Sequence, residues 1–109
     1  MSTTNQPATD QAQLTQWLAA SNQRVVVLAF VADWAGSALI LRQFLERIVS
    51  DSPEVAVHYV DVDLDPQLSV DFGVNLVPSV VLLRNQTIVD MIDGVISRRK
   101  LAQRISAHQ

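Results

Sequence analysis

An apolar run of eight residues, Val25–Ala32, stops abruptly at Asp33. The run is too short to cross a membrane as a helix, which takes about 20 residues. It is rich in β-branched valine and contains no polar position, which is typical of a strand covered on both faces. Such a strand needs a layer of helices on each side, so the run predicts an α/β fold.

The apolar spacing on either side of this run predicts the remaining elements. In order, they are a helix beginning at Thr9 or Asp10, the strand 25–31, a helix with the apolar face Leu41, Phe44, Leu45, Ile48 and Val49, a buried strand over 55–60, a short helix between Asp65 and Gly73, two strands over 79–83 and 87–92 joined by a turn at Asn85-Gln86, and a helix beginning at Ser97. Strands linked through helices pair in parallel, whereas the closing hairpin is antiparallel. We therefore expect a mixed sheet with helices on both faces.

The length of 109 residues indicates one domain, which we expect to span residues 9–109. Residues 1–8 are polar and include Pro7, so they are expected to form a flexible tail. This segment lacks the basic start and apolar stretch of a secretory signal peptide. We expect a cytoplasmic protein with no membrane partner.

The chain contains no cysteine. That absence excludes disulfides, thiolate zinc sites, iron–sulfur clusters and thiol nucleophiles. The formal net charge of −3 argues against nucleic acid as a partner, because such binding depends on a basic surface. We expect neither a cofactor nor a metal.

Several segments carry a family resemblance through their order and spacing. Residues 27–38 place a buried strand directly before Trp34-Ala35-Gly36-Ser37-Ala38, residues 61–66 end a strand at a helix start, residues 72–79 hold Val77-Pro78, and Gly94 follows the last strand. Together they resemble the thioredoxin family, whose first segment runs into Trp-Cys-Gly-Pro-Cys. The resemblance implies a thioredoxin-like α/β fold with four central strands, a fifth within residues 1–8 being absent or poorly formed. It also implies a cis peptide bond between Val77 and Pro78.

The chain departs from the family where the family's chemistry resides. Ala35 and Ala38 occupy the two cysteine positions, Ala29 that of the buried carboxylate, and Tyr59 that of the neighbouring lysine. In the family, one thiolate attacks a substrate disulfide and the second resolves the mixed disulfide. Alanine can do neither, so no catalytic residue is assigned.

Two explanations of the paired alanines remain open. Natural loss of redox chemistry is favoured, because an experimenter replacing two cysteines has no reason to change Ala29 and Tyr59 as well. The alternative is a thioredoxin-type thiol–disulfide oxidoreductase whose cysteines were replaced. An encoded sequence with cysteines at positions 35 and 38 would establish that alternative.

The leading functional hypothesis is a redox-inactive protein that binds a protein or an extended peptide through the former active-site face. In the family, a bound peptide pairs with the main chain before the cis-proline, here Val77, and needs no sulfur. Trp34 would serve as the apolar anchor, although Asp93 adds a charge beside it. The candidate binding residues are Trp34, Ala35, Gly36, Ser37, Leu76, Val77, Pro78, Gly94 and Val95. A further alternative is a self-associating structural module that uses the same patch, and the expected state is a monomer or a weak homodimer.

Three other features have simpler interpretations. Ser37 lacks a histidine base nearby in the sequence, so it is interpreted as a helix cap or first-turn residue and not as a nucleophile. Asp61, Asp63 and Asp65 resemble the start of a calcium loop, but the required glycine and glutamate are missing, which favours a strand end and helix cap. The cluster Arg98, Arg99, Lys100 and Arg104 is interpreted as a solvated helix face, with docking of an acidic partner as the alternative.

Overall fold

A computed structural model of the chain describes residues 10–109. The predicted flexible tail of residues 1–8, where the family's first strand would fall, lies outside the described residues. The elements are α1 (Gln11–Ala20), β1 (Val26–Val31), α2 (Ala38–Asp51), β2 (Ala56–Asp61), α3 (Pro66–Asp71), β3 (Ser79–Arg84), β4 (Thr87–Asp93) and α4 (Arg98–Ser106). The order of helices and strands is the one predicted from the sequence.

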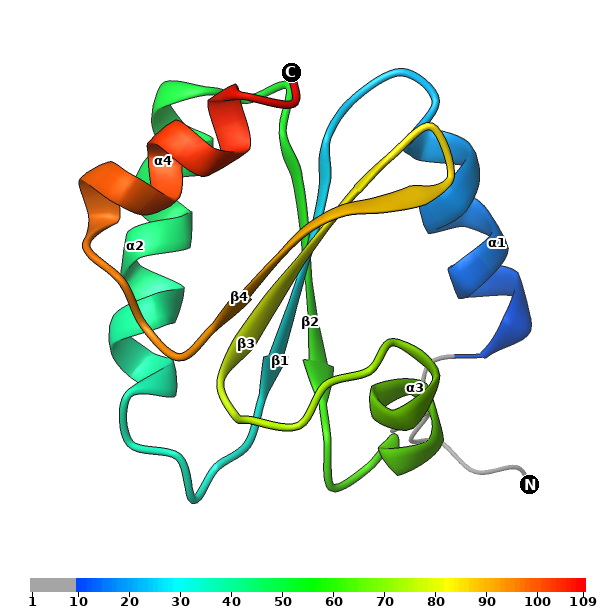
Figure 1. Ribbon diagram of the computed structural model, residues 1–109, viewed down its shortest axis with the longest axis vertical. Coiled ribbons are helices and arrows are strands. Elements are labelled where there is room, and N and C mark those ends of the chain that lie inside the picture. Colours follow the sequence, from blue (N-terminus) through cyan, green and yellow to red (C-terminus); the bar gives the residue numbers. More distant parts are fainter. Residues whose placement is uncertain (1–9) are drawn as a thin grey trace.

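The four strands form one mixed sheet in the order β2-β1-β3-β4. β1 runs parallel to β2 and antiparallel to β3, and β3 pairs antiparallel with β4. Helices α2 and α4 cover one face of the sheet, whereas α1 and α3 cover the other (Figure 1). The predicted thioredoxin-like architecture of four strands between helices is therefore confirmed.

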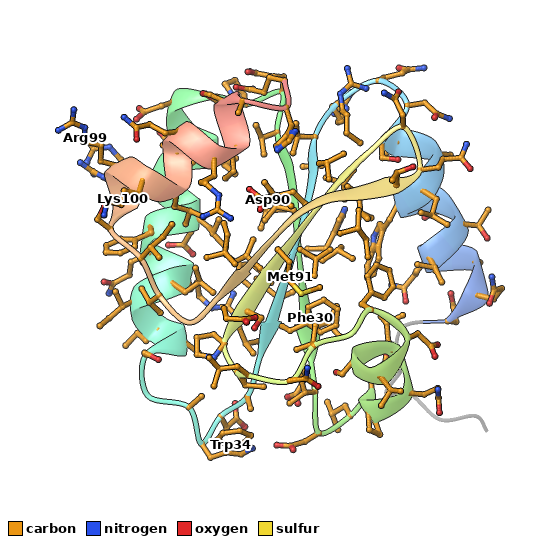
Figure 2. The ribbon with its side chains drawn as sticks, in the orientation of Figure 1. Phe30, Trp34, Asp90, Met91, Arg99 and Lys100 are labelled. Carbon is orange, nitrogen blue, oxygen red and sulfur yellow. The ribbon has the colours of Figure 1, made fainter. Side chains whose placement is uncertain are left out.

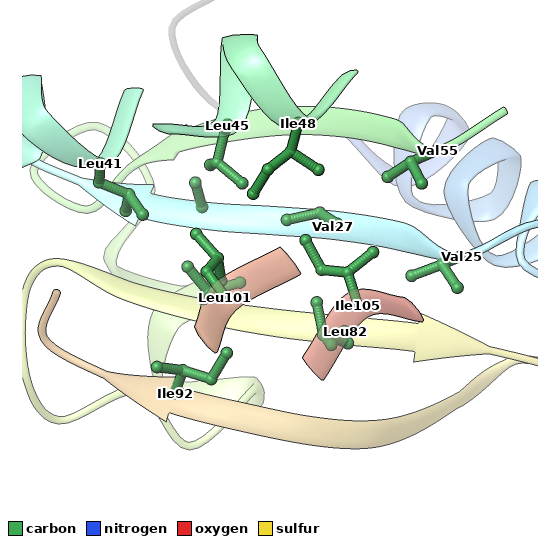
Figure 3. Packing of buried hydrophobic residues seen from close by; sticks show 12 residues of the cluster. Val25, Val27, Leu41, Leu45, Ile48, Val55, Leu82, Ile92, Leu101 and Ile105 are labelled. Atoms are coloured by element: carbon green, nitrogen blue, oxygen red, sulfur yellow. The ribbon is translucent and has the colours of Figure 1, made fainter. Parts of the chain in front are cut away.

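The side chains of β1 alternate between two apolar cores. Val27 and Ala29 pack with residues of α2 and α4, including Leu45 and Leu101, in the cluster shown in Figure 3. Val26, Leu28 and Phe30 face the opposite way and join a second cluster, which includes Trp17 of α1 and Leu68 of α3. The continuous apolar run thus supplies both cores, as a strand covered on both faces must.

The strand predicted over 55–60 is present as β2, but the prediction that this strand is buried was wrong. β2 is an outer strand of the sheet that residues 10–109 form, and five of its six residues are half-exposed. His58 stacks on Trp17 at 4.9 Å between ring centroids, and Arg42 lies 3.9 Å from the centre of the Tyr59 ring. Burial lowers the pKa of His58. The side chains of His58 and Tyr59 thus lie on an outer strand, which the apolar pattern alone had placed in the interior of the sheet.

Polar side chains define the ends of three helices. The Asp10 carboxylate accepts from the main-chain N–H of Gln13, whose own side chain accepts from Asp10 in a capping box. The side chains of Asp65 and Ser97 cap α3 and α4 by accepting from the main-chain N–H three residues further on. Gly73 follows α3 with φ +72°, a conformation that glycine adopts without steric cost.

The β3–β4 turn is attached to the end of α1 through Ser21. Asn85 and Gln86 both have positive φ, as a two-residue hairpin turn requires. The Gln86 N–H donates to Ser21 Oγ at 2.8 Å, and the Asn85 N–H donates to the Ser21 carbonyl at 2.7 Å. The Ser21 hydroxyl itself donates to the carbonyl of Leu18 at 2.6 Å, so one buried serine holds glutamine in a conformation that normally favours glycine.

A bidentate ion pair attaches α4 to β4. Arg104 donates from Nε and Nη2 to the two carboxylate oxygens of Asp90, each at 2.6 Å. The hydrogen bonds from Arg104 hold the pKa of Asp90 below its ordinary value. Arg104 therefore belongs to the structural interface between helix and sheet. The other three cations of the predicted cluster, Arg98, Arg99 and Lys100, are exposed to solvent.

Replacing Ser21 with alanine is expected to lower the free energy of unfolding by about 1–3 kcal/mol, because the Gln86 N–H loses its acceptor inside the protein. Urea denaturation followed by circular dichroism measures this loss. Ser50→Ala removes an exposed hydroxyl from α2 and should change stability little. Equal stability of the two variants would contradict the role assigned to Ser21.

Replacing Asp90 with asparagine is expected to cost about 1 kcal/mol at pH 7, since solvent screens a pair whose arginine is nearly half exposed. The Asp90 pKa is lowered on folding from an ordinary value of 3.8, so its contribution is present above that pH. The contribution is lost as the pH falls through the lowered pKa of the folded state.

Urea unfolding of both proteins between pH 7 and the acid range tests this pH dependence. Asp51→Asn is the matched control, because Asp51 lies 3.7 Å from Arg47 in an exposed pair within α2. A stability difference between wild type and Asp90→Asn that did not shrink with acidification would contradict the assignment.

Candidate binding site

The strand register brings four chain segments to one end of the sheet. Val31 lies opposite Asp61, and Ser79 lies opposite both Phe30 and Asp93. The loops that follow β1, β2 and β4 and the loop that precedes β3 therefore share this end, at the bottom of Figure 1. We call the surface formed by residues 32–40, 61–65, 74–78 and 93–95 the rim.

Trp34 is the most prominent side chain of the rim. The chain turns after β1 through a bond from the Ala35 N–H to the Ala32 carbonyl at 3.1 Å, which leaves the indole 66% exposed (Figure 2). Trp34 Nε1 donates to Asp63 Oδ2 at 2.8 Å. The main-chain N–H of Asp63 in turn donates to Asp61 Oδ1 at 2.9 Å, so two carboxylates fix the orientation of a solvent-facing aromatic ring.

The loop before β3 contains the predicted cis peptide bond between Val77 and Pro78, and the structure confirms it. Pro78 is buried, and its carbonyl accepts from the Gly94 N–H at 2.8 Å. The buried Ser79 hydroxyl donates to the Leu76 carbonyl and lies 3.2 Å from Asp93 Oδ1. These contacts join the loop before β3 to the end of β4.

The main chain of Val77 stands apart from these contacts. Within residues 10–109, neither its N–H nor its carbonyl makes a hydrogen bond to another residue. The neighbouring Leu76 side chain is 51% exposed, and a Cβ placed on Gly94 would lie 4.0 Å from Leu76 Cδ2. The rim therefore presents the unpaired main-chain N–H and carbonyl of Val77 beside an exposed apolar side chain.

The structure adds two apolar side chains that the sequence analysis missed. Leu39 is 61% and Ile40 is 47% exposed at the start of α2, outside the stripe of core positions. The sequence did contain a signal for them, because both are apolar and both lie outside the inward-facing positions of the predicted helix. Leu39 also lines a groove of about 360 Å³, together with Val31, Ala32, Asp33, Ala35, Gly36, Ala38 and Arg42.

The predicted site residues differ in accessibility. Trp34, Gly36, Ser37 and Leu76 are exposed, Ala35, Val77, Gly94 and Val95 are half-buried, and Pro78 is buried. Pro78 therefore shapes the backbone of the loop, but its ring is not accessible for contact with a partner. Ser37 occupies the N-cap position of α2, but its side chain makes no capping hydrogen bond.

The positions at which the family carries its chemistry hold groups that cannot perform it in this chain. Ala29 is fully buried and lies opposite Tyr59 in the β1–β2 register. Burial raises the pKa of Tyr59, against the opposing charge of Arg42. Ala35 and Ala38 provide only methyl groups, and the chain has no cysteine, so thiol–disulfide exchange has no nucleophile here.

The two histidines make their ring and charge contacts with residues other than Ser37. His58 is stacked on Trp17, and His108 lies 4.0 Å from Asp90, so neither histidine is assigned to Ser37 as a base. Among residues 10–109, no three potential metal-binding side chains gather to hold an ion. No helix in that range is both long and apolar enough to span a bilayer.

Comparison with known proteins agrees with this geometry. The thioredoxin of Mycoplasmoides gallisepticum is 30% identical over 95 residues, which cover 87% of this chain and 93% of that protein. The thioredoxin of Chlamydia muridarum is 29% identical over 85 residues, covering 78% of this chain and 83% of its own length.

Solved structures show the same likeness in three dimensions. Fasciola hepatica thioredoxin superimposes with a TM-score of 0.82 at 26% identity, covering 90% of this chain and 93% of that one. A mutant thioredoxin from Halobacterium salinarum gives a TM-score of 0.81 at 27% identity, with coverage of 97% and 96%. The sequence profile of the thioredoxin family matches residues 6–107. With this match over nearly its whole length, the chain belongs to the thioredoxin family, as a member without the two active-site cysteines.

Proposed function

We propose that this protein is a redox-inactive binding module that holds an extended segment of a partner protein against the rim. The unpaired main chain of Val77 carries the proposal. A peptide N–H and carbonyl that lack internal partners can pair with the backbone of an incoming strand. This mode of recognition uses main-chain groups and needs no sulfur, so it is compatible with alanine at positions 35 and 38.

Exposed apolar side chains supply the second element of the proposed site. Trp34, Leu39, Leu76 and Ile40 are all at least 47% exposed. Large apolar side chains at a protein surface are typical of interaction sites, and tryptophan is a frequent energetic hot spot in interfaces. The hydrogen bond from Trp34 to Asp63 restricts the indole before binding, which reduces the entropy lost on association.

Carboxylates surround this apolar surface and restrict the partner's charge. Asp33, Asp61, Asp63 and Asp93 belong to the rim, and none of them forms an ion pair with a cation of the described chain. Arg42 lines the same groove as Asp33, but its guanidinium is stacked on Tyr59. We therefore propose that the bound segment is apolar at its centre and neutral or basic at its flanks.

Short random peptides displayed on phage and selected on the immobilised protein test this function. The selected sequences would be synthesised and titrated calorimetrically against the wild type and a Trp34→Ala/Leu76→Ala variant. The variant is expected to bind at least about ten-fold more weakly, because it removes two apolar anchors from the rim. Trp34 and Leu76 are exposed, so the variant should retain its circular dichroism spectrum.

Ile88→Ala is the matched control, because Ile88 is a 42% exposed apolar residue at the start of β4, beside the hairpin turn and away from the rim. Its affinity for the selected peptides should equal that of the wild type. Equal affinity of all three proteins, or no selected peptide, would refute the proposed function. Dimerisation in sedimentation that Trp34→Ala/Leu76→Ala abolishes would instead assign the rim to self-association.

A further inference from the structure

A second surface lies between α2 and α4, at the end of α2 away from the rim. It is a groove of about 720 Å³, which falls within the roughly 300–1,000 Å³ typical of ligand sites. The two helices that form it lie side by side on one face of the sheet (Figure 1). We call it the α2/α4 groove, and its lining residues include Arg47, Ile48, Asp51, Arg98, Arg99, Ala102 and Ile105.

The charge of the α2/α4 groove is opposite to that of the whole chain. Arg47, Arg98 and Arg99 line it, and Asp51 is the one acidic residue in its lining. Asp51 lies 3.7 Å from Arg47. Arg98 and Arg99 form no ion pair with any acidic side chain of residues 10–109. A chain of net charge −3 thus places two unpaired arginines in the α2/α4 groove.

Helix stability does not account for these arginines. Arg98, Arg99 and Lys100 form the first turn of α4, and that turn contains no acidic residue. The helix dipole makes this end positive, so cations there oppose the dipole and one another. Figure 2 shows Arg99 on the outer side of α4, away from the sheet, where it contributes nothing to the core. Arg104 differs, since it is bound to Asp90 of β4.

We propose that the α2/α4 groove docks an acidic segment of a partner protein. Guanidinium groups form paired hydrogen bonds with carboxylates, so Arg98 and Arg99 can bind two aspartates or glutamates of the segment. Small apolar side chains between those acids would contact Ile48 and Ala102, which also line the groove. This surface is separate from the rim and selects the opposite partner charge, so the two proposals stand or fall independently.

The phage-displayed library also tests this inference, through a different variant. Peptides selected on the wild type would be sorted by their binding to Arg98→Gln/Arg99→Gln. The control is Arg24→Gln/Lys100→Gln, which removes the same two charges: Arg24 is exposed before β1, and Lys100 adjoins the groove without lining it. Peptides that depend on the groove arginines are expected to be rich in aspartate or glutamate. Their affinity for Arg98→Gln/Arg99→Gln should fall by about ten-fold or more, and change little in the control.

Two further measurements distinguish docking in the groove from loss of stability and from binding at the rim. The melting temperature of Arg98→Gln/Arg99→Gln should equal or exceed that of the wild type, because the substitution removes cations from a helix N-terminus. Acidic peptides should also bind Trp34→Ala/Leu76→Ala normally. The proposal is overturned if no selected peptide depends on Arg98 and Arg99, if both charge variants lose binding equally, or if inorganic phosphate displaces the peptides.

Discussion

The burial of β1 on both faces is the constraint from which the rest of the structure follows. Residues Val26–Phe30 are fully shielded from solvent, and full burial of each large apolar side chain stabilises the fold by about 1.5–3 kcal/mol. Those gains require α2 and α4 on one side and α1 and α3 on the other. A strand so enclosed can reach solvent only at its ends, and its carboxyl end leads directly to Trp34. The exposed indole is therefore a consequence of how the central strand must terminate.

Periodic patterns predicted the elements that are buried in a regular manner, and missed what depends on distant partners. Local apolar patterns were enough to predict β1, from the run Val25–Ala32, and α2, from its apolar stripe. The exposure of β2 depends on which strand lies at the sheet edge, and no local pattern encodes that. The bond from Trp34 to Asp63 and the pair of Arg104 with Asp90 join residues 29 and 14 positions apart, which only the folded chain brings together.

The candidate site also contains features that could be predicted before the structure was known and features that could not. The cis bond at Pro78 belongs to loop geometry that the resemblance carried over correctly, whereas the positive φ of Gly94 and the exposure of Leu76 are findings of the structure. The missing thiols could be identified from composition alone. What neither source revealed is the pair Leu39 and Ile40, because apolar residues on the outer face of a helix contribute nothing to a core pattern. They become visible as surface only once α2 has been placed on the sheet.

Loss of the cysteines removes the family's chemistry without dismantling the surface on which it operated. The Val77–Pro78 loop is joined to β4 through the Gly94 N–H and placed beside Asp93 by the Ser79 hydroxyl, and the indole of Trp34 is held by Asp63. None of these contacts involves positions 35 or 38. Function on a common fold resides in the site and not in the scaffold, so the proposed recognition role depends on the surface that these contacts hold in place and not on the missing thiols.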